Sequence, residues 1–388
     1  MNAFIRLRSF SCMITDPRVE RTKIHHLADI IVIALYAIVC NACGWLDIEK
    51  TAKDRIDEIK ISLPNGIPSH DTFGRVFRRI NPDELQTAIT GWFEGEWRIL
   101  HGEELSFKGE TAAMDGKTLK HSFDTASGLS PLHSISVFAT EHMTVLRQIF
   151  GRAKDSEITQ DVKLLKQVDL EGAVVTADAI ACQKKTVLQI IEGGGADCII
   201  GCKDSQPSLF ARILDCFADA ARNEECYVTS RAQTTDSGGH GRIEYRACAC
   251  IDVPMLGDEI FSAWTGIRTI VRIADIRDDA SGRKSPVRYF ISSLPCSAKD
   301  IMRRIRQHWR IENSLHYVLD VTCGEDASRI RKDNGPHNFA ILLRAALACI
   351  RNNMPSAGEP GIATVRQARL KAMRNPEYAR RIFTGEHN

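Results

Sequence analysis

The sequence predicts an α/β protein whose core is a mixed β-sheet covered by helices, preceded by a small all-α domain. Two observations lead to this prediction. Apolar residues recur at helical spacing over roughly the first 100 positions, whereas three strand-like runs and then alternating helices and strands follow residue 110. The 388 residues are 44% hydrophobic and 26% charged, which is the balance of a soluble globular chain with roughly two to three domains.

The front segment carries the signals of a helical domain. An apolar helix is expected over 27–40 and an amphipathic one over 46–60. A turn over 63–68 precedes Ser69, which is a suitable N-cap for a helix over 70–80. The basic residues of that last helix are compatible with helix-turn-helix DNA binding, although any small helical domain contains such a helix.

Neither a membrane span nor an exported, disulfide-bonded protein is expected. The apolar run over 27–40 has 14 residues and contains Asp29, and a bilayer span needs about 20 residues. No leader-like segment follows the N-terminal arginines, so the 13 cysteines are expected to stay reduced in a cytosol. Cys40 and Cys43 form a lone C-x-x-C. Without a second pair, buried thiols are favoured over a zinc site.

The order of elements after residue 110 predicts the core fold. The expected strands are 111–114, 132–139, 143–150, 172–177 and 197–202, and the expected helices are 157–168, 184–192 and 206–221. Three strands followed by alternating helices and strands is the order of a ribonuclease H-like core. Residues 224–296 alternate polar and apolar positions and are expected to form an antiparallel β insertion, with a helix resuming at about Ala298.

Two aspartates stand at the predicted carboxyl ends of buried strands. Open α/β sheets place functional groups at this edge, and Asp115 and Asp178 both fall there. Asp115 is followed by glycine, so an ordinary turn explains it equally well. Asp178 stands in Thr-Ala-Asp-Ala, without a turn glycine, and its alternative role is a helix cap.

A third acid lies on the helix that follows the predicted insertion. His308, Glu312, His316 and Asp320 step by four and share one helix face, whereas Ile305, Trp309, Leu315 and Leu319 are expected to form a buried neighbouring stripe. The zinc-protease pattern H-E-x-x-H is absent. Clustered carboxylates favour a hard cation such as Mg²⁺. Two such ions would support in-line attack on a phosphodiester by water or by a 3′-hydroxyl.

Five segments together carry a family resemblance. They are LPNGIPSHDTFGRVFRRINP (63–82), AMDGKTLKHS (113–122), VVTADAIACQKK (174–185), GHGRIE (239–244) and HWRIENSLHYVLDVTCGEDASRIRKDN (308–334). In this order they resemble the Asp-Asp-Glu transposases of bacterial insertion sequences, and most closely the H-repeat-associated proteins of Rhs elements. The first segment resembles the accessory N-terminal domain of that group.

The resemblance implies a ribonuclease H-like transposase with Asp115, Asp178 and Glu312 as catalytic, metal-binding acids and two Mg²⁺ or Mn²⁺ ions as cofactors. The acids are separated by 63 and then 134 positions, and a β insertion accounts for the longer gap. The domains are expected to be a helical accessory domain over 1–105, which is a candidate for DNA binding, a catalytic core over 106–222 and 297–352, a β-rich insertion over 223–296 and a basic C-terminal tail over 353–388.

The charge distribution suggests where double-stranded DNA would bind. Residues 299–388 contain 16 Lys and Arg against 9 Asp and Glu, a net charge of +7, whereas the whole chain is +2. Such a concentration suits phosphate contacts, although a solvated helix face would explain the tail alone as well. The candidate DNA-binding residues are Lys117, Lys120, Arg242, Arg306, His308, Arg310, Arg329, Arg331 and Lys332.

The main hypothesis is therefore a cytoplasmic bacterial transposase that cleaves DNA and transfers strands at inverted repeats, as a homo-oligomer on DNA and without a membrane role. A nuclease without strand transfer would use the same core. A decayed relic that only binds DNA is the third possibility, because Tyr317 and Cys323-Gly324 depart from the pattern of the closer group.

Overall fold

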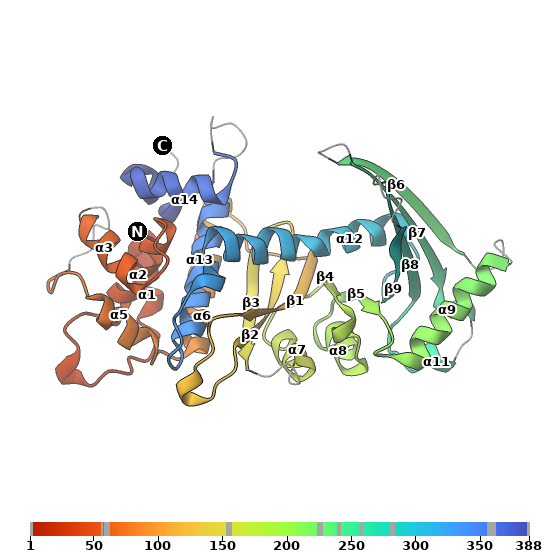
Figure 1. Cartoon of the computed structure of the whole chain (residues 1–388), viewed down its shortest axis with the longest axis horizontal. Helices are drawn as coiled ribbons and strands as arrows, with labels where there is room; N and C mark the ends of the chain where they lie inside the picture. The colour runs from red at the N-terminus through yellow and green to blue at the C-terminus, as the bar shows by residue number, and fades with distance from the viewer. Residues whose placement is uncertain are drawn as a thin grey trace.

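The computed structural model describes residues 3–55, 57, 63–152, 157–222, 228–238, 242–256, 259–278, 284–354 and 362–385. It has the mixed α/β architecture that the sequence predicts. A nine-stranded sheet with the order β3-β2-β1-β4-β5-β9-β8-β7-β6 extends from a body of helices at one end to a curved β arm at the other (Figure 1).

The N-terminal part of the described chain is helical, as predicted. Its helices are α1 (Ala3–Ser11), α2 (Leu27–Val39), α3 (Trp45–Asp54), α5 (His70–Phe77) and α6 (Pro82–His101). The uniformly apolar α2 is buried along its whole length. Ser69 caps α5 by accepting a hydrogen bond from the backbone N–H of Thr72. α3 ends at Asp54, and residues 58–62 of the predicted longer helix lie outside the described residues.

No helix in the described ranges has both the length and the apolarity needed to cross a lipid bilayer. The apolar α2 is instead a core helix, because its side chains pack against α1, α3 and α13 (Gly335–Asn353).

The first five strands form the predicted core of the sheet. They are β1 (Thr111–Leu119), β2 (Leu132–Ala139), β3 (Thr144–Gly151), β4 (Val174–Ala177) and β5 (Asp197–Cys202). β2 is antiparallel to both β1 and β3, and β4 and β5 run parallel to β1. The intervening helices are α7 (Glu157–Leu165), α8 (Lys184–Leu188), which continues as a π-helical turn η5 (Gln189–Gly193), and α9 (Pro207–Arg222).

Asp115 lies inside a strand, so the predicted strand end at this position is wrong. β1 continues to Leu119 because its second half pairs with β2, from Gly116 opposite Ile135 onward. The parallel pairing with β4, however, stops at Met114 opposite Ala177. Asp115 is therefore the first residue beyond the parallel part of β1. Asp178 is the corresponding first residue beyond β4, so the two aspartates stand at the same edge.

The predicted insertion is β-rich and extends the core sheet. Its strands are β6 (Ser230–Gly238), β7 (Arg242–Asp252), β8 (Thr269–Asp278) and β9 (Lys284–Ser292), with η6 (Val253–Leu256) and α11 (Glu259–Ser262) between β7 and β8. All four strands pair antiparallel in sequence order. The last of them, β9, pairs with β5, where Ile291 stands opposite Ile200. The insertion therefore continues the core sheet from its β5 side.

The chain after the insertion is mostly helical. It forms α12 (Ala298–Arg310), the π-helical turns η7 (Ile311–His316) and η8 (Val318–Thr322), the short η9 (Glu325–Ala327), α13, α14 (Val365–Arg374) and α15 (Pro376–Thr384). The segment predicted as a basic tail thus contains two packed helices. Ala368 and Ala372 of α14 and Ile382 and Phe383 of α15 are buried.

One hydrophobic core joins the N-terminal helices, α13 and the C-terminal helices. Phe383 of α15 stacks on Phe4 of α1 with ring centroids 4.4 Å apart, and it also meets Tyr36 of α2 and Trp92 of α6. The two ends of the chain therefore belong to a single helical body beside the sheet.

Arg369 of α14 is buried although its helix is strongly basic. Its guanidinium donates to the carbonyl oxygens of Thr322 (2.6 Å), Ile38 (3.2 Å) and Ala42 (3.3 Å). It thereby satisfies carbonyls at the end of α2 and at the end of η8. This arginine holds elements together, and its buried position does not suit a DNA contact.

We expect Arg369→Met to lower the free energy of unfolding by about 3 kcal/mol, because it leaves three buried carbonyls without their charged donor. Equilibrium urea denaturation of the full chain measures this loss. Arg366→Met, on the exposed face of the same helix, should change the value by less than about 0.5 kcal/mol. Equal effects of the two substitutions would contradict the structural role of Arg369.

Candidate active site

The helix α12 lies across the sheet (Figure 1). Hydrogen bonds fix it to β1 and β4. The hydroxyl of Thr111 on β1 donates to Gln307 (2.7 Å) and accepts from Arg304 Nη1 (3.2 Å). On β4, Thr176 Oγ1 lies 3.0 Å from His308 Nδ1. These contacts fix where α12 ends relative to the sheet. Because η7 continues directly from α12, they also fix the position of Glu312.

The histidines that recur at four-residue steps along this helix lie beside the two aspartates. His308 Nε2 lies 3.9 Å from Asp178 Oδ1, and His316 Nδ1 lies 3.4 Å from Asp115 Oδ2. Glu312 stands between the two histidines on the same helix. The predicted shared face therefore forms, and it brings all three acids to one edge of the sheet.

The predicted apolar stripe of the same helix forms only in part. Ile305, Leu315 and Leu319 are buried, but Trp309 is 41% exposed. Ile311, which is fully buried, takes the core position instead. The π-helical geometry from Ile311 onward changes the angular step per residue, so a stripe extrapolated at α-helical spacing does not hold through this segment.

Asp178 lines two cavities and links the other two acids. A cavity of about 260 Å³, here called the Glu312 cavity, is lined by Asp178, His308 and Glu312 among others. A second cavity of about 200 Å³, the Asp115 cavity, is lined by Asp115 and Asp178. Asp178 occupies the N-cap position of η4 (Ala179–Ala181), but its side chain makes no capping hydrogen bond, so the helix-cap alternative is wrong.

The electrostatics of the Glu312 cavity reflect two neighbouring carboxylates. Partial burial, followed by the negative charge of Asp178, raises the pKa of Glu312 above its usual value. Within the described ranges, no three His, Cys, Asp or Glu side chains converge closely enough to hold a metal ion as they stand. The acids therefore meet in pairs, with Asp178 common to both pairs.

Burial lowers the pKa of both histidines beside the acids. Burial, together with the positive charges of Arg344 and Lys117, lowers the pKa of His316 to about 3. Burial lowers the pKa of His308 as well, against the opposing influence of Asp178. His316 Nε2 is buried and has no hydrogen-bond partner among the described residues. His316 was not among the predicted site residues, although its place four residues after Glu312 marked it on the same face.

Lys117, two residues after Asp115, belongs to a buried ion-pair network. Its ammonium lies 2.6 Å from Asp320, 3.0 Å from Glu325 and 3.3 Å from Asp326. Glu325 also pairs with Arg344 of α13, and both of those side chains are almost completely buried. Three carboxylates thus surround Lys117, which is only 9% exposed. This arrangement fits a role in tying β1 to η8, η9 and α13 better than the predicted DNA contact.

The other predicted DNA-binding residues differ in how far they are already engaged. Lys120 pairs with Asp326 (2.7 Å), and Lys332 pairs with Asp124 (2.9 Å). Arg331 donates to the carbonyl of His121 and lies over the ring of Phe123.

Three of the predicted DNA-binding arginines are exposed. Arg306 and Arg310 lie on α12, and Arg329 follows η9. Arg310 also donates to the carbonyl of Thr140 (2.9 Å). The side chain of Arg242 lies outside the described residues. Contact with DNA stays a prediction for this set.

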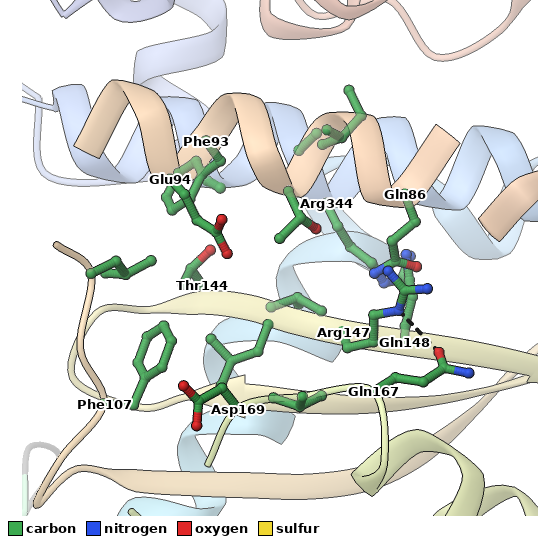
Figure 2. Close-up of a pocket in the computed structure, with 18 of the residues that line it drawn as sticks. Gln86, Phe93, Glu94, Phe107, Thr144, Arg147, Gln148, Gln167, Asp169 and Arg344 are labelled. Carbon is green, nitrogen blue, oxygen red and sulfur yellow. Dashed lines mark hydrogen bonds between the residues drawn. The ribbon is translucent and has the colours of Figure 1, made fainter. Parts of the chain in front are cut away.

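A cavity of about 500 Å³ lies away from the acids, between α6, β3 and α13 (Figure 2). Glu94 and Asp169 stand at one end of it, and Arg147, whose Nε donates to Gln167 (3.1 Å), stands at the other. None of the three candidate acids lines it. This cavity therefore belongs to the seam between the helical body and the sheet and not to the candidate active site.

The ion pairs of Glu325 make stability depend on pH. Burial alone would raise the pKa of Glu325, but Arg344 and Lys117 outweigh burial and hold it below the ordinary 4.5. A carboxylate with a depressed folded-state pKa stabilises the fold above its unfolded pKa, and this stabilisation is lost as the pH falls through the folded value.

We expect Glu325→Gln to lower the free energy of unfolding by about 3 kcal/mol at pH 7, because Arg344 and Lys117 lose a buried counter-charge. The difference from wild type should shrink as the pH falls below 4.5 and through the lower folded-state pKa of Glu325, where the wild-type carboxyl becomes protonated. Urea denaturation at several pH values measures both effects, with Glu103→Gln on the surface as the control. A difference independent of pH would argue against an ionised Glu325.

Two family matches cover most of the chain. Residues 106–349 match the family described as Transposase DDE domain, and residues 8–93 match the family described as DDE_Tnp_1-associated. The first region contains all three candidate acids, and the second covers most of the N-terminal helices.

Individual relatives agree with these matches. The chain is 32% identical to the H repeat-associated putative transposase YhhI of Escherichia coli K12, over 90% of this chain and 91% of the relative. It is 32% identical to the putative transposase YncI of Escherichia coli O157:H7, over 89% of this chain and 87% of the relative. A shorter match of 40% identity covers 16% of this chain and 75% of the inactive transposase YbfQ of Escherichia coli K12.

The predicted resemblance to the H-repeat-associated transposases is confirmed by these matches. Because the domain match spans more than half of its length and carries Asp115, Asp178 and Glu312, the chain belongs to the DDE transposase family.

Proposed function

We propose that the chain is an active transposase that cleaves DNA at the inverted repeats of an insertion sequence and transfers the resulting 3′ ends to a target. One observation carries this proposal. The helix that follows the β insertion brings Glu312 into a cavity with Asp178, while Asp178 shares a second cavity with Asp115. Three acids from distant parts of the sequence thus lie at one sheet edge, where α/β proteins place their functional groups.

The strand arrangement supports a ribonuclease H-like core. The order β3-β2-β1-β4-β5, with three antiparallel strands followed by two that are parallel to β1, matches the element order from which the sequence predicts that fold. In this core Asp115 lies on β1, Asp178 directly follows the adjacent strand β4, and Glu312 comes from a helix that crosses both strands. The domain limits proposed from the sequence remain part of this proposal.

The donor set of the site fits Mg²⁺ or Mn²⁺. Asp115, Asp178 and Glu312 offer carboxylate oxygens, which are the ligands that these hard cations prefer. Burial first, and then the negative charge of Asp178, raise the pKa of Glu312, and a bound cation would favour its ionised form. The pKa of about 3 leaves His316 without a positive charge to offset the acids. When bound, two such ions would supply activation of a water or 3′-hydroxyl nucleophile and stabilisation of the leaving oxygen.

The residues of the chain would hold the reacting groups in place. Asp178, common to both cavities, would hold both ions, with Asp115 and Glu312 completing the two sides. The contact of Thr176 with His308 fixes the helix against β4, and the Lys117 network fixes the part of β1 that carries Asp115. Such prior positioning is the main protein contribution to a metal-assisted phosphoryl transfer.

The exposed face of α12 would guide double-stranded DNA to the site. Lys299, Arg303, Arg306 and Arg310 recur along its solvent side and lead to Glu312. Their positive charge would contact the phosphate backbone without reading sequence, so we expect salt-dependent binding. We further propose that the protein acts as a homo-oligomer that bridges two DNA ends in the bacterial cytoplasm.

We expect Asp115→Asn, Asp178→Asn and Glu312→Gln each to reduce Mg²⁺-dependent cleavage of a labelled fragment that carries the inverted repeats, by at least about a thousandfold. Each substitution removes a charged metal ligand and keeps the shape of the side chain. Asp219→Asn, at an exposed position of α9, is the matched control and should cleave like wild type. Unchanged cleavage by the three acid variants would show that the acids are assigned wrongly.

Detection of the cleaved 3′ end joined to a target fragment would separate the transposase from a nuclease that only hydrolyses DNA. Binding of the end fragment by the wild type without any cleavage would favour the relic that retains only DNA binding.

A further inference from the structure

A lysine that the site assignment does not include stands beside the candidate acids. Lys203 is the first residue after β5, as Asp178 is the first residue after the neighbouring parallel strand β4. The carboxyl ends of parallel neighbours meet at the same edge of a sheet. Accordingly, Lys203 lines the Glu312 cavity together with Asp178 and Glu312.

The loop that carries Lys203 is anchored to the loop that carries Asp178. A Cβ at Gly201 would lie 3.1 Å from the backbone nitrogen of Ala179, so the two chain segments approach closely. Beyond the lysine, Ser205 Oγ donates to the carbonyl of Ala179 (3.4 Å), and Gln206 Nε2 donates to the carbonyl of Cys182 (2.9 Å). These contacts on both sides of Lys203 hold its backbone at a fixed place relative to Asp178.

The two cationic side chains that line this cavity are engaged differently. Arg288 of β9 pairs with Asp275 (2.7 Å) and lies over the ring of Trp309, 5.5 Å from the ring centroid. Lys203 is exposed to solvent, and no described carboxylate forms an ion pair with it. Its ammonium is therefore available to a ligand, whereas the guanidinium of Arg288 already has a counter-charge and an aromatic contact.

An uncommitted cation beside two carboxylates suits a substrate that carries its own negative charge. A DNA phosphate that approaches Asp178 and Glu312 would be repelled by them, even with bound cations nearby, and a lysine at the rim offsets this repulsion. Lysine acts on phosphate as a point charge and needs no fixed bidentate geometry. Its flexible stem lets the ammonium follow the phosphate as the reaction proceeds.

We propose that Lys203 binds the DNA phosphate at which the strand is cut. This phosphate would lie in the Glu312 cavity, between Asp178 and Glu312. The inference rests on the proposed transposase function and adds a substrate-binding residue to it. Lys203 would hold the phosphate from the β5 side of the cavity, while α12 and Glu312 close the opposite side. It thereby also sets the direction from which the strand enters the site.

The test compares Lys203→Ala, Lys203→Arg and Lys166→Ala in the full chain. Lys166 is an exposed lysine just after α7 and outside both cavities. Binding of a fluorescent end fragment is measured over a range of salt concentrations without divalent metal. Loss of one phosphate contact should lower the slope of log K against log salt by about 0.9 in Lys203→Ala and leave it unchanged in Lys203→Arg and Lys166→Ala. Single-turnover cleavage by Lys203→Ala should be slower by about 10- to 100-fold.

A fragment with an uncharged methylphosphonate at the cleavage position tests the contact without relying on activity. Wild type should bind the methylphosphonate fragment as weakly as Lys203→Ala binds the same fragment. Lys203→Ala should bind the methylphosphonate fragment and normal DNA with equal affinity. Equal salt slopes and equal losses on the methylphosphonate for wild type and Lys203→Ala would overturn the inference even if the wild type cleaves DNA. A wild type that shows the phosphate contact but never cleaves would contradict the proposed function and leave the Lys203 contact supported.

Discussion

The packing of α12 across the sheet is the constraint on which the candidate site depends. Asp115 and Asp178 reach the same edge through strand pairing alone, because β1 and β4 are parallel neighbours. Glu312 has no such support, since it comes from a segment 134 positions after Asp178. Its place is set by the contacts of α12 with Thr111 and Thr176, which fix the helix along its axis. A slip of α12 by one turn, about 5.4 Å, would remove Glu312 from the cavity it shares with Asp178.

The β insertion explains how α12 can be held there. The first turns of α12 bury Ala298, Ile301 and Ile305 in a cluster with Cys248 and Cys250 of β7, and β8 and the core strands also contribute to this cluster. The backbone N–H of Ala298 also donates to Ser230 on β6. Without the inserted strands this apolar face of the helix would be exposed to water. Part of the long gap between the second and third acids is therefore chain that builds the surface under α12.

The order of elements could be predicted well because the spacing of apolar residues within each segment indicates whether it forms a helix or a strand. The limits of β2 and β5, the cap at Ser69 and the β insertion follow from such signals. Facts that depend on distant partners were not predictable. Asp115 looked like a strand end because its glycine suggests a turn, whereas pairing with β2 carries the strand onward. Lys117 looked available for DNA because its three acidic partners lie about 200 positions later in the chain.

The net charge of the C-terminal quarter is a second example of a property whose meaning depends on the folded structure. Its net charge of +7 suggested a surface for DNA, yet Arg344 and Arg369 are buried and serve the fold. Arginine is suited to both tasks, because one guanidinium can satisfy several buried carbonyls or one phosphate. Burial distinguishes the arginines that stabilise the fold from those that can bind phosphate, and the net charge of a segment does not show which arginines are buried. The exposed basic residues that remain lie partly along α12, directly before Glu312, and partly elsewhere, as Arg366 and Arg374 on α14 show.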